Sequence, residues 1–133
     1  MGAGERPGLY MIYPLGNAIA ASPETPYLQI GESKYGKPIL DRVVTPETSL
    51  ADAQKAALLS MDSTLRSNLS VGMPLDLAVI ERDDLRLTHR RRILDGDPAF
   101  MEMSAAWSAA LRESFVKVTI WGGPAERRAR KDV

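Results

Sequence analysis

The chain of 133 residues contains no cysteine and only one histidine, His89. The lack of cysteine excludes disulfides and thiolate zinc sites, and it is compatible with a reducing compartment. One imidazole leaves only carboxylates as further metal ligands, which is a poor basis for a metal site. We therefore expect neither a metal ion nor a cofactor.

Net charge and long apolar runs are missing as well. The 17 Lys and Arg residues balance the 17 Asp and Glu residues, so no overall field attracts the chain to nucleic acid or anionic lipid. No apolar run approaches the ~20 residues that cross a bilayer. The Gly-rich start has no apolar segment typical of a signal peptide. We expect a cytoplasmic protein with no nucleic-acid and no membrane partner.

Apolar periodicity and turn residues divide the chain into short elements. The predicted strands are 9–13, 18–21, 27–30, 75–81, 85–91 and 115–121. The predicted helices are 33–43, 46–67 and 98–113. Strands and helices are segregated along the chain, which favours an α+β layered fold over an alternating Rossmann-type fold. We expect one domain over 9–121, a disordered start over 1–8 and a charged tail over 122–133.

Two of the predicted helices carry an apolar stripe. The 46–67 helix, with Thr45 as its expected cap, has a stripe that we expect to pack on a sheet. Its members are Leu50, Ala53, Ala57, Met61 and Leu65. The stripe of the 98–113 helix consists of Phe100, Met103, Trp107 and Leu111.

His89 lies on a predicted strand that continues into three arginines, Arg90 to Arg92. A Ser-His-Asp triad is conceivable from residue counts, but no Gly-x-Ser-x-Gly elbow is present and alternation makes His89 an ordinary surface residue. The arginines and the basic residues 127–131 could contact nucleic acid. Nearby acidic residues and few aromatics favour a solvated face instead.

Hydroxyl side chains are dense at the end of the 46–67 helix and in the turn that follows it. They belong to Ser60, Ser63, Thr64, Ser67 and Ser70. Such residues form helices poorly and compete for backbone hydrogen bonds, so their density marks either a cap or a site. A cap would use Asn68 or Gly72 as the left-handed residue. The residues alone leave both interpretations open.

Three segments resemble signature stretches of the Anbu (ancestral beta subunit) family of bacterial proteasome-type peptidases. They are 9–17, 31–42 and 60–72, the last followed by Pro74-Leu75-Asp76. The resemblance covers residues 9 to about 121 and corresponds to the C-terminal part of a subunit. It implies the N-terminal nucleophile (Ntn hydrolase) fold, an αββα sandwich of two antiparallel sheets between helix layers, here partial and lacking the N-terminal strands.

The resemblance also implies roles for three serines. Proteasome-type subunits carry Gly-Ser-Gly-Ser before one helix, and Ser33 matches the second serine of that motif. They carry Arg-Asp-x-x-Ser-Gly-Gly after the next helix, where Arg66, Ser70 and Gly72 match while Ser67 replaces the carboxylate. Ser33, Ser67 and Ser70 are therefore expected to support a catalytic centre without being its nucleophile.

The family's threonine-type mechanism needs a Thr, Ser or Cys at the mature N-terminus, whose side chain attacks the peptide carbonyl. A Lys and an Asp of the first strands assist it. Residues 1 and 2 are Met and Gly, so we expect the nucleophile to be missing and the chain to be inactive alone. The expected partners are further copies or the N-terminal half of a related subunit, with a polypeptide substrate only once completed. The alternative is a non-catalytic assembly or interaction remnant.

Overall fold

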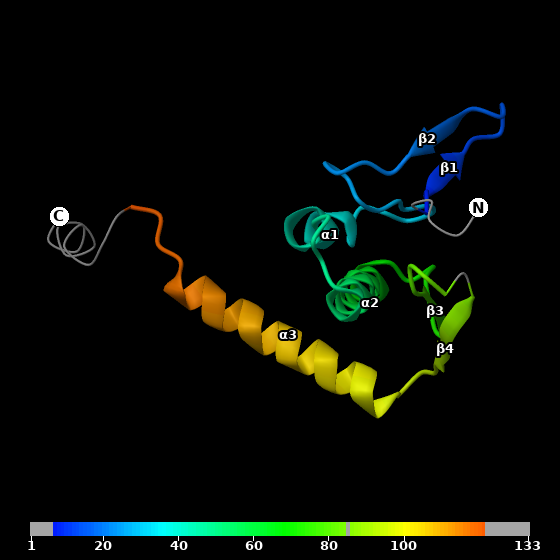
Figure 1. The fold of residues 1–133 in the computed structure, drawn as a ribbon. Helices are drawn as coiled ribbons and strands as arrows, with labels where there is room; N and C mark the ends of the chain where they lie inside the picture. Colours follow the sequence, from blue (N-terminus) through cyan, green and yellow to red (C-terminus); the bar gives the residue numbers. More distant parts are fainter. Residues whose placement is uncertain (1–6, 85, 122–133) are drawn as a thin grey trace, which may run out of the picture.

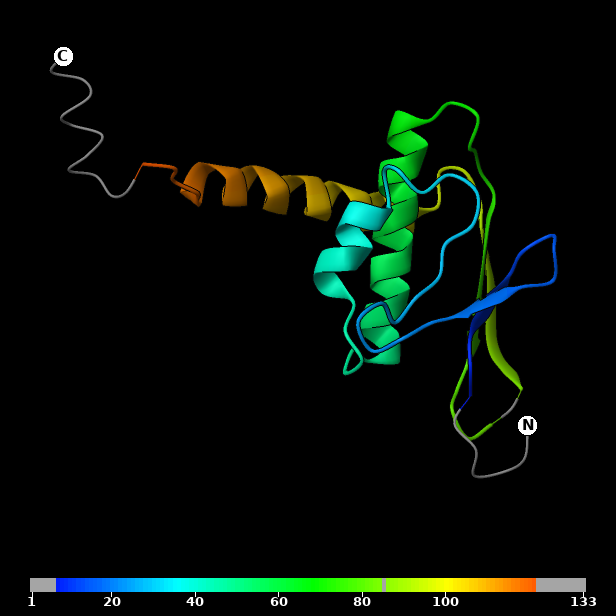
Figure 2. The ribbon, with the colours of Figure 1, turned by 90° about the horizontal axis from the view of Figure 1, so that it is seen from above.

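The structure is a computed structural model that describes residues 7–84 and 86–121 (Figure 1). Its elements, in chain order, are β1 (Tyr10–Ile12), β2 (Ala18–Ala20), α1 (Lys37–Val43), α2 (Leu50–Ser67), β3 (Leu75–Ile80), β4 (Leu87–Ile93) and α3 (Pro98–Lys117). Helices α1 and α2 lie side by side at the centre. Figures 1 and 2 both place the two strand hairpins on one side of this pair, while α3 extends away on the other side. The result is a small mixed helix-and-strand fold.

The strands form two separate antiparallel hairpins. In the first, Tyr10 pairs with Ala20, and the turn is closed by the Tyr13 N–H donating to the Asn17 carbonyl at 2.8 Å. Gly16 in this turn has φ +86°, a left-handed conformation that favours glycine. In the second, Leu75 pairs with Ile93, with an irregularity next to Val79. Neither sheet has a third strand within the described residues.

The predicted strand over 27–30 is wrong. Residues 27–30 are in neither a helix nor a strand. The Tyr27 hydroxyl instead donates to the Asp41 carboxylate on α1, and the Lys37 ammonium group donates to the same carboxylate at 2.9 Å. These bonds hold the segment against α1, and no described strand pairs with it.

Helix α2 begins later than predicted, because a different residue caps it. The Ser49 hydroxyl accepts from the Asp52 N–H at 3.1 Å, which is N-cap geometry. Thr45 does not cap α2. Its backbone N–H donates to the Thr48 hydroxyl at 2.8 Å, and this local turn precedes the helix.

The face of α2 that is most buried is not the predicted stripe. Leu50 is exposed, and the other four stripe residues are only half-buried. The buried residues of α2 are Ala56, Leu59, Ser60, Asp62 and Thr64. This helix packs mainly against α1 and α3. The stripe is thus only partly covered within the described residues, and its packing on a sheet stays a prediction.

Helix α3 starts as predicted but runs further. The Asp97 carboxylate caps it by accepting from the Phe100 N–H at 2.9 Å. It continues to Lys117, so the predicted strand over 115–121 is wrong: 115–117 are helical and 118–121 are not in a strand. Alternating apolar and polar residues form a strand only where a neighbouring strand pairs with them. The Lys117–Glu113 ion pair at 2.9 Å, by contrast, is four residues apart and stabilises the helix locally.

The expected disordered start and charged tail fall largely outside the described residues, which exclude 1–6 and 122–133. Within the part that is described, no helix combines the length and apolar character that a membrane span requires.

Candidate functional site

The hydroxyl-rich end of α2 turns sharply without a left-handed residue. Asn68 is the C-cap with φ −129°, and its N–H donates to the Thr64 carbonyl at 2.9 Å. Gly72 is not among the glycines with positive φ. The left-handed cap considered for Asn68 or Gly72 is therefore not present.

The Asn68 side chain joins two segments that are far apart in the sequence. Its Nδ2 donates to Glu32 Oε2 at 3.1 Å, across 36 residues. Its Oδ1 accepts from the Ser70 N–H at 3.0 Å and from the Ser70 hydroxyl at 2.6 Å. Glu32 Oε1 in turn accepts from the Lys34 N–H at 3.0 Å. We call this connected set of side chains the Glu32–Asn68–Ser70 link.

A close approach between α1 and α2 brings the same two segments together. Gly36 is buried, and a Cβ placed on it would lie 2.0 Å from Ser60 Oγ and 3.1 Å from the Ser60 carbonyl oxygen. Only glycine leaves room for this contact. The neighbouring Gln29 amide oxygen is buried and has no hydrogen-bond partner in the described structure.

The three predicted serines differ in their hydrogen bonds and in their exposure. Ser70 is part of the Glu32–Asn68–Ser70 link, and half-buried Ser33 lies in the loop that Glu32 ties down, where its carbonyl accepts from the Lys37 N–H at 3.0 Å. Ser67 is exposed, and its side chain makes no hydrogen bond within residues 7–84 and 86–121. The sequence-based reasoning missed Glu32 and Asn68 as site residues. The available signal was a polar residue inside each motif, Glu32 between Gly31 and Ser33, and Asn68 between Ser67 and Leu69.

The chemistry of these serines is limited by their partners. The Ser70 hydroxyl donates to an amide oxygen, which cannot take a proton as a general base does. His89 is exposed on β4, opposite Val79. Among the described residues, neither His89 nor a carboxylate accepts a hydrogen bond from Ser33, Ser67 or Ser70. The arrangement can position groups but supplies no activated nucleophile.

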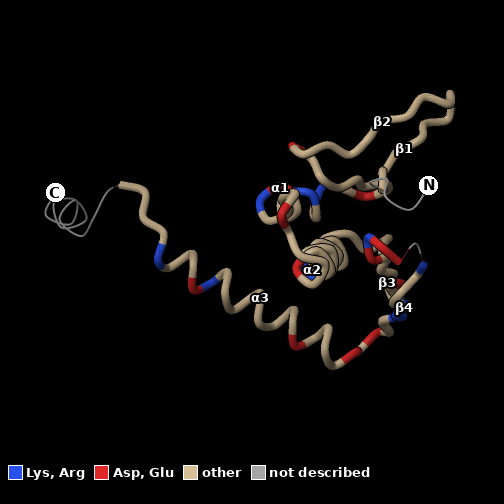
Figure 3. Tube along the Cα trace, in the orientation of Figure 1, with Lys and Arg blue, Asp and Glu red and all other residues tan. Residues whose placement is uncertain are grey.

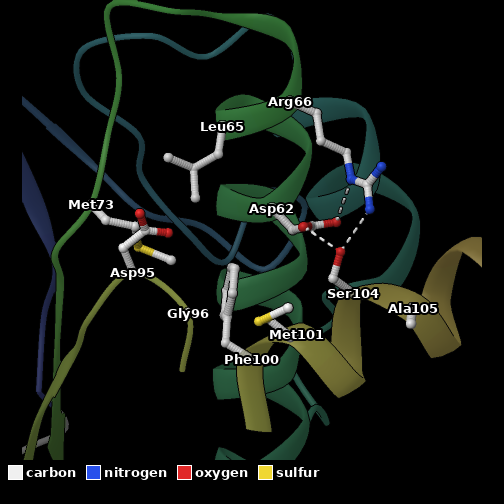
Figure 4. Close-up of a pocket in the computed structure, with 10 residues that line it drawn as sticks. All are labelled: Asp62, Leu65, Arg66, Met73, Asp95, Gly96, Phe100, Met101, Ser104 and Ala105. Carbon is white, nitrogen blue, oxygen red and sulfur yellow. Dashed lines mark hydrogen bonds and ion pairs between the residues drawn. The ribbon is translucent and has the colours of Figure 1, made fainter. Parts of the chain in front are cut away.

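A cavity of about 720 Å³ lies between α2, the segment before β3 and the start of α3 (Figure 4). Its polar wall is internally paired. The Asp62 side chain is only 8% exposed; it accepts from the Ser104 hydroxyl at 2.7 Å and lies 3.4 Å from Arg66 Nε. Arg66 Nη2 also donates to Ser104 Oγ at 2.8 Å. This network fastens α3 to the last turns of α2.

A second polar cluster fixes α1 against the segment before it. Lys37 Nζ lies 5.5 Å from the centre of the Tyr27 ring and 3.1 Å from its hydroxyl. Hydrogen bonds from Tyr27 and Lys37 lower the pKa of Asp41. The Asp41 carboxylate in turn raises the pKa of Lys37, and burial followed by that carboxylate raises the pKa of Tyr27. The cluster is a local clamp at the surface.

The arginine run on β4 is partly neutralised by Asp76 of its own hairpin and by Asp97, the N-cap of α3. Arg92 makes two hydrogen bonds to Asp76, at 2.8 and 2.9 Å, and they lower the pKa of that carboxyl group. Arg91 lies 3.1 Å from Asp97, whose pKa is lowered first by the Phe100 N–H and then by Arg91. Figure 3 shows acidic and basic residues interspersed along the chain. The described residues contain no group of three or more His, Asp or Glu side chains that could hold a metal ion.

Solved structures of Anbu proteins are similar to this chain over most of its length. An Anbu (Gly-1) mutant from Hyphomicrobium sp. strain MC1 has 55% identity and a TM-score of 0.85, covering 90% of this chain and 51% of that chain. Anbu from Yersinia bercovieri has 49% identity and a TM-score of 0.82, with coverages of 87% and 50%. The helical assembly of the Anbu complex from Pseudomonas aeruginosa has 52% identity and a TM-score of 0.81, with coverages of 92% and 51%. No protein-family model and no curated protein sequence matches the chain.

The chain therefore spans about half the length of the solved Anbu chains that it matches. Its similarity to them extends to both sequence and backbone, so it goes beyond a shared fold. The resemblance to the Anbu family is confirmed. This chain belongs to the Anbu (ancestral beta-subunit) family and corresponds to about half of an Anbu subunit, consistent with its C-terminal part.

Proposed function

We propose that residues 9–121 are the C-terminal portion of a proteasome-type, N-terminal nucleophile peptidase subunit, and that they support peptide-bond hydrolysis only when the other half of the subunit is present. In this proposal β1–β2 and β3–β4 are parts of the two sheets of an αββα sandwich, and the other half adds strands to them. Ser33, Ser67 and Ser70 then lie close to the attacking group. The charged residues beyond 121 stay outside the domain.

The Glu32–Asn68–Ser70 link is the observation that carries the proposal. It joins the segment that matches the Gly-Ser-Gly-Ser motif to the segment that matches the Arg-Asp-x-x-Ser-Gly-Gly motif. Hydrogen bonds that fix both segments at one place are what a catalytic centre needs, because displacements of about 1 Å at such a centre cost rate. The same link favours a positioning role for Ser70, since its hydroxyl is committed to Asn68.

Inactivity of the 133-residue chain alone follows from chemistry. A serine hydroxyl is a weak nucleophile at neutral pH unless a base next to it accepts its proton. Ser70 has an amide oxygen as its partner, and exposed Ser67 has no side-chain partner in the described structure. In the proposed mechanism, the attacking hydroxyl or thiol, the free amine and the assisting Lys and Asp all come from the other half.

The test is peptide hydrolysis with and without the missing half. The purified chain is incubated with fluorogenic peptides alone, and again after co-expression with the N-terminal half of a complete Anbu relative. We expect turnover only in the second case. Ser67→Ala serves as the matched control for Ser70→Ala, because the Ser67 hydroxyl makes no hydrogen bond in the described structure while the Ser70 hydroxyl donates to Asn68 Oδ1. Turnover by the chain alone that Ser70→Ala abolishes would make Ser70 a nucleophile and overturn the proposal.

A second candidate is an assembly module without catalysis. Only six hydrophobic residues are buried in the described parts of the chain, whereas 21 large hydrophobic residues are exposed. Such an excess of exposed apolar surface is typical of a chain that binds partners. Because an Anbu complex forms a helical assembly, we propose that this chain also contacts further copies of itself. Association with the other half in the absence of any turnover would favour this candidate.

A further inference from the structure

The distal half of α3, residues 109–117, has nothing packed against it within the described structure. The first half of the helix is attached to α2 through Ser104, which bonds both Asp62 and Arg66. Trp107 lines a small pocket with Val43 and Leu59 of the neighbouring helices. From residue 109 onward every described residue is exposed. Both ribbon views show the helix leaving the body of the molecule (Figures 1 and 2).

The exposed part continues an apolar stripe that is already used for packing. On the first half of α3 the stripe contains buried Phe100 and half-buried Met103 and Trp107. Steps of three and four residues keep side chains on one side of a helix. The same steps lead on to Leu111 and Phe115 on α3 and to its C-cap Val118, which are 51%, 82% and 69% exposed. We call these last three residues the α3 stripe.

The α3 stripe carries no charge. The charged residues of this region, Arg112, Glu113 and Lys117, lie on other sides of the helix at about 100° per residue. Lys117 and Glu113 are paired with each other at 2.9 Å. The surface beside them is therefore apolar and suited to another apolar surface.

Two partners could cover the α3 stripe: the other half of the same subunit, or a second copy of the subunit. The position of the stripe decides between them, and this step rests on the proposed function. Strands of the other half can join β1–β2 and β3–β4 only at their edges, and both hairpins lie on the opposite side of α1 and α2 from the distal half of α3. A half-domain that completes the sheets is thus directed away from the stripe. We propose that the α3 stripe docks on an apolar surface of a second copy of this subunit and forms part of the contact between copies.

The size of the stripe predicts how strong the contact is. Residues 109–117 span about 14 Å at a rise of about 1.5 Å per residue. One face of such a segment is well below the ~800 Å² per partner of a stable interface. The chain alone should therefore associate weakly and in a concentration-dependent manner. Because the stripe is uncharged, this association should change little with salt.

The experiment compares two double variants of the full chain by sedimentation velocity over a concentration series. Leu111→Glu/Phe115→Glu places two carboxylates on the stripe. Ala109→Glu/Val116→Glu places the same charge on the opposite side of the same exposed helix, where Val116 is 78% exposed. We expect the first pair to weaken self-association at least about tenfold, or about 1.4 kcal/mol, and the second pair to change it less than about twofold, or about 0.4 kcal/mol. Unchanged helicity by circular dichroism shows that both variants are folded.

Three results would overturn the proposal: equal weakening by both pairs, no weakening by the stripe pair, or a wild-type chain that stays monomeric throughout the series. A fourth is a stripe variant that self-associates normally but no longer binds a co-expressed N-terminal half, because the stripe then lies inside the subunit. These results test the α3 stripe separately from the proposed peptidase function. If the other half restores turnover with the stripe variant, the peptidase proposal stands whatever the assembly does.

Discussion

Replacing Asn68 by Asp is the sharpest perturbation of the Glu32–Asn68–Ser70 link. The change turns the Nδ2 donor into an oxygen and leaves Oδ1 able to accept from Ser70. The new oxygen would stand about 3.1 Å from Glu32 Oε2, where a hydrogen bond now exists. A bond is thereby exchanged for repulsion between two carboxylates, with almost no change in shape.

The magnitude follows from the burial of the pair. A hydrogen bond to a charged acceptor contributes about 1.5–3 kcal/mol. Asn68 and Glu32 are both half-buried, so solvent reduces that range as well as the repulsion. We expect Asn68→Asp to lower the free energy of unfolding at neutral pH by about 2 kcal/mol. Glu32→Gln alone should cost about 1–2 kcal/mol, because its single amide oxygen can accept from Asn68 or from the Lys34 N–H but not from both.

Combining the two substitutions reverses the polarity of the bond. The Gln amide can donate to the new carboxylate, so we expect the double variant to regain at least about 1 kcal/mol relative to Asn68→Asp. The assay is urea denaturation followed by circular dichroism, at one low protein concentration because self-association raises apparent stability. If the two effects add to within about 0.5 kcal/mol, the residues do not interact and the reasoning fails.

Three further predictions concern the framework of the site. Gly36→Ala should destabilise the chain by about 1–3 kcal/mol because the new methyl group meets Ser60, and adding Ser60→Ala should restore part of the loss; an equally unstable double variant by urea denaturation would contradict this. Asp62→Ala should lower the free energy of unfolding by about 1–3 kcal/mol, because the carboxylate is buried and paired. The control Asp52→Ala, which removes an exposed partner of Lys55, should lower it by at most about 1 kcal/mol. Equal losses would refute a special role for the buried carboxylate. The pKa of Asp97 is lowered in the folded chain, so its stabilising contribution is present above the unfolded value of about 3.9 and is lost as the pH falls through the lower folded value. Asp97→Asn should remove this part of the acid dependence of stability, and an unchanged acid profile would count against it.

Local signals in the sequence were sufficient for several elements. The Pro14–Asn17 turn with a strand on each side, and the Pro98 start of α3, are both confirmed. The long helix and the hairpin from Leu75 are confirmed with shifted ends. These features depend on residues within a few positions of one another, such as turn glycines, helix caps and apolar periodicity. The motifs that resemble Anbu are also contiguous, which is why the family could be identified before the fold.

The tertiary structure decided what depends on distant residues. Residues 115–117 alternate like a strand yet lie in a helix, because no described strand is available to pair with them. The most buried face of α2 differs from its apolar stripe, because α1 and α3 pack against that face. Asn68 bonds to Glu32 across 36 residues, and no local pattern specifies that pairing. Period and capping fix the type of an element, but packing partners fix which of its faces is buried and which of its polar groups meet.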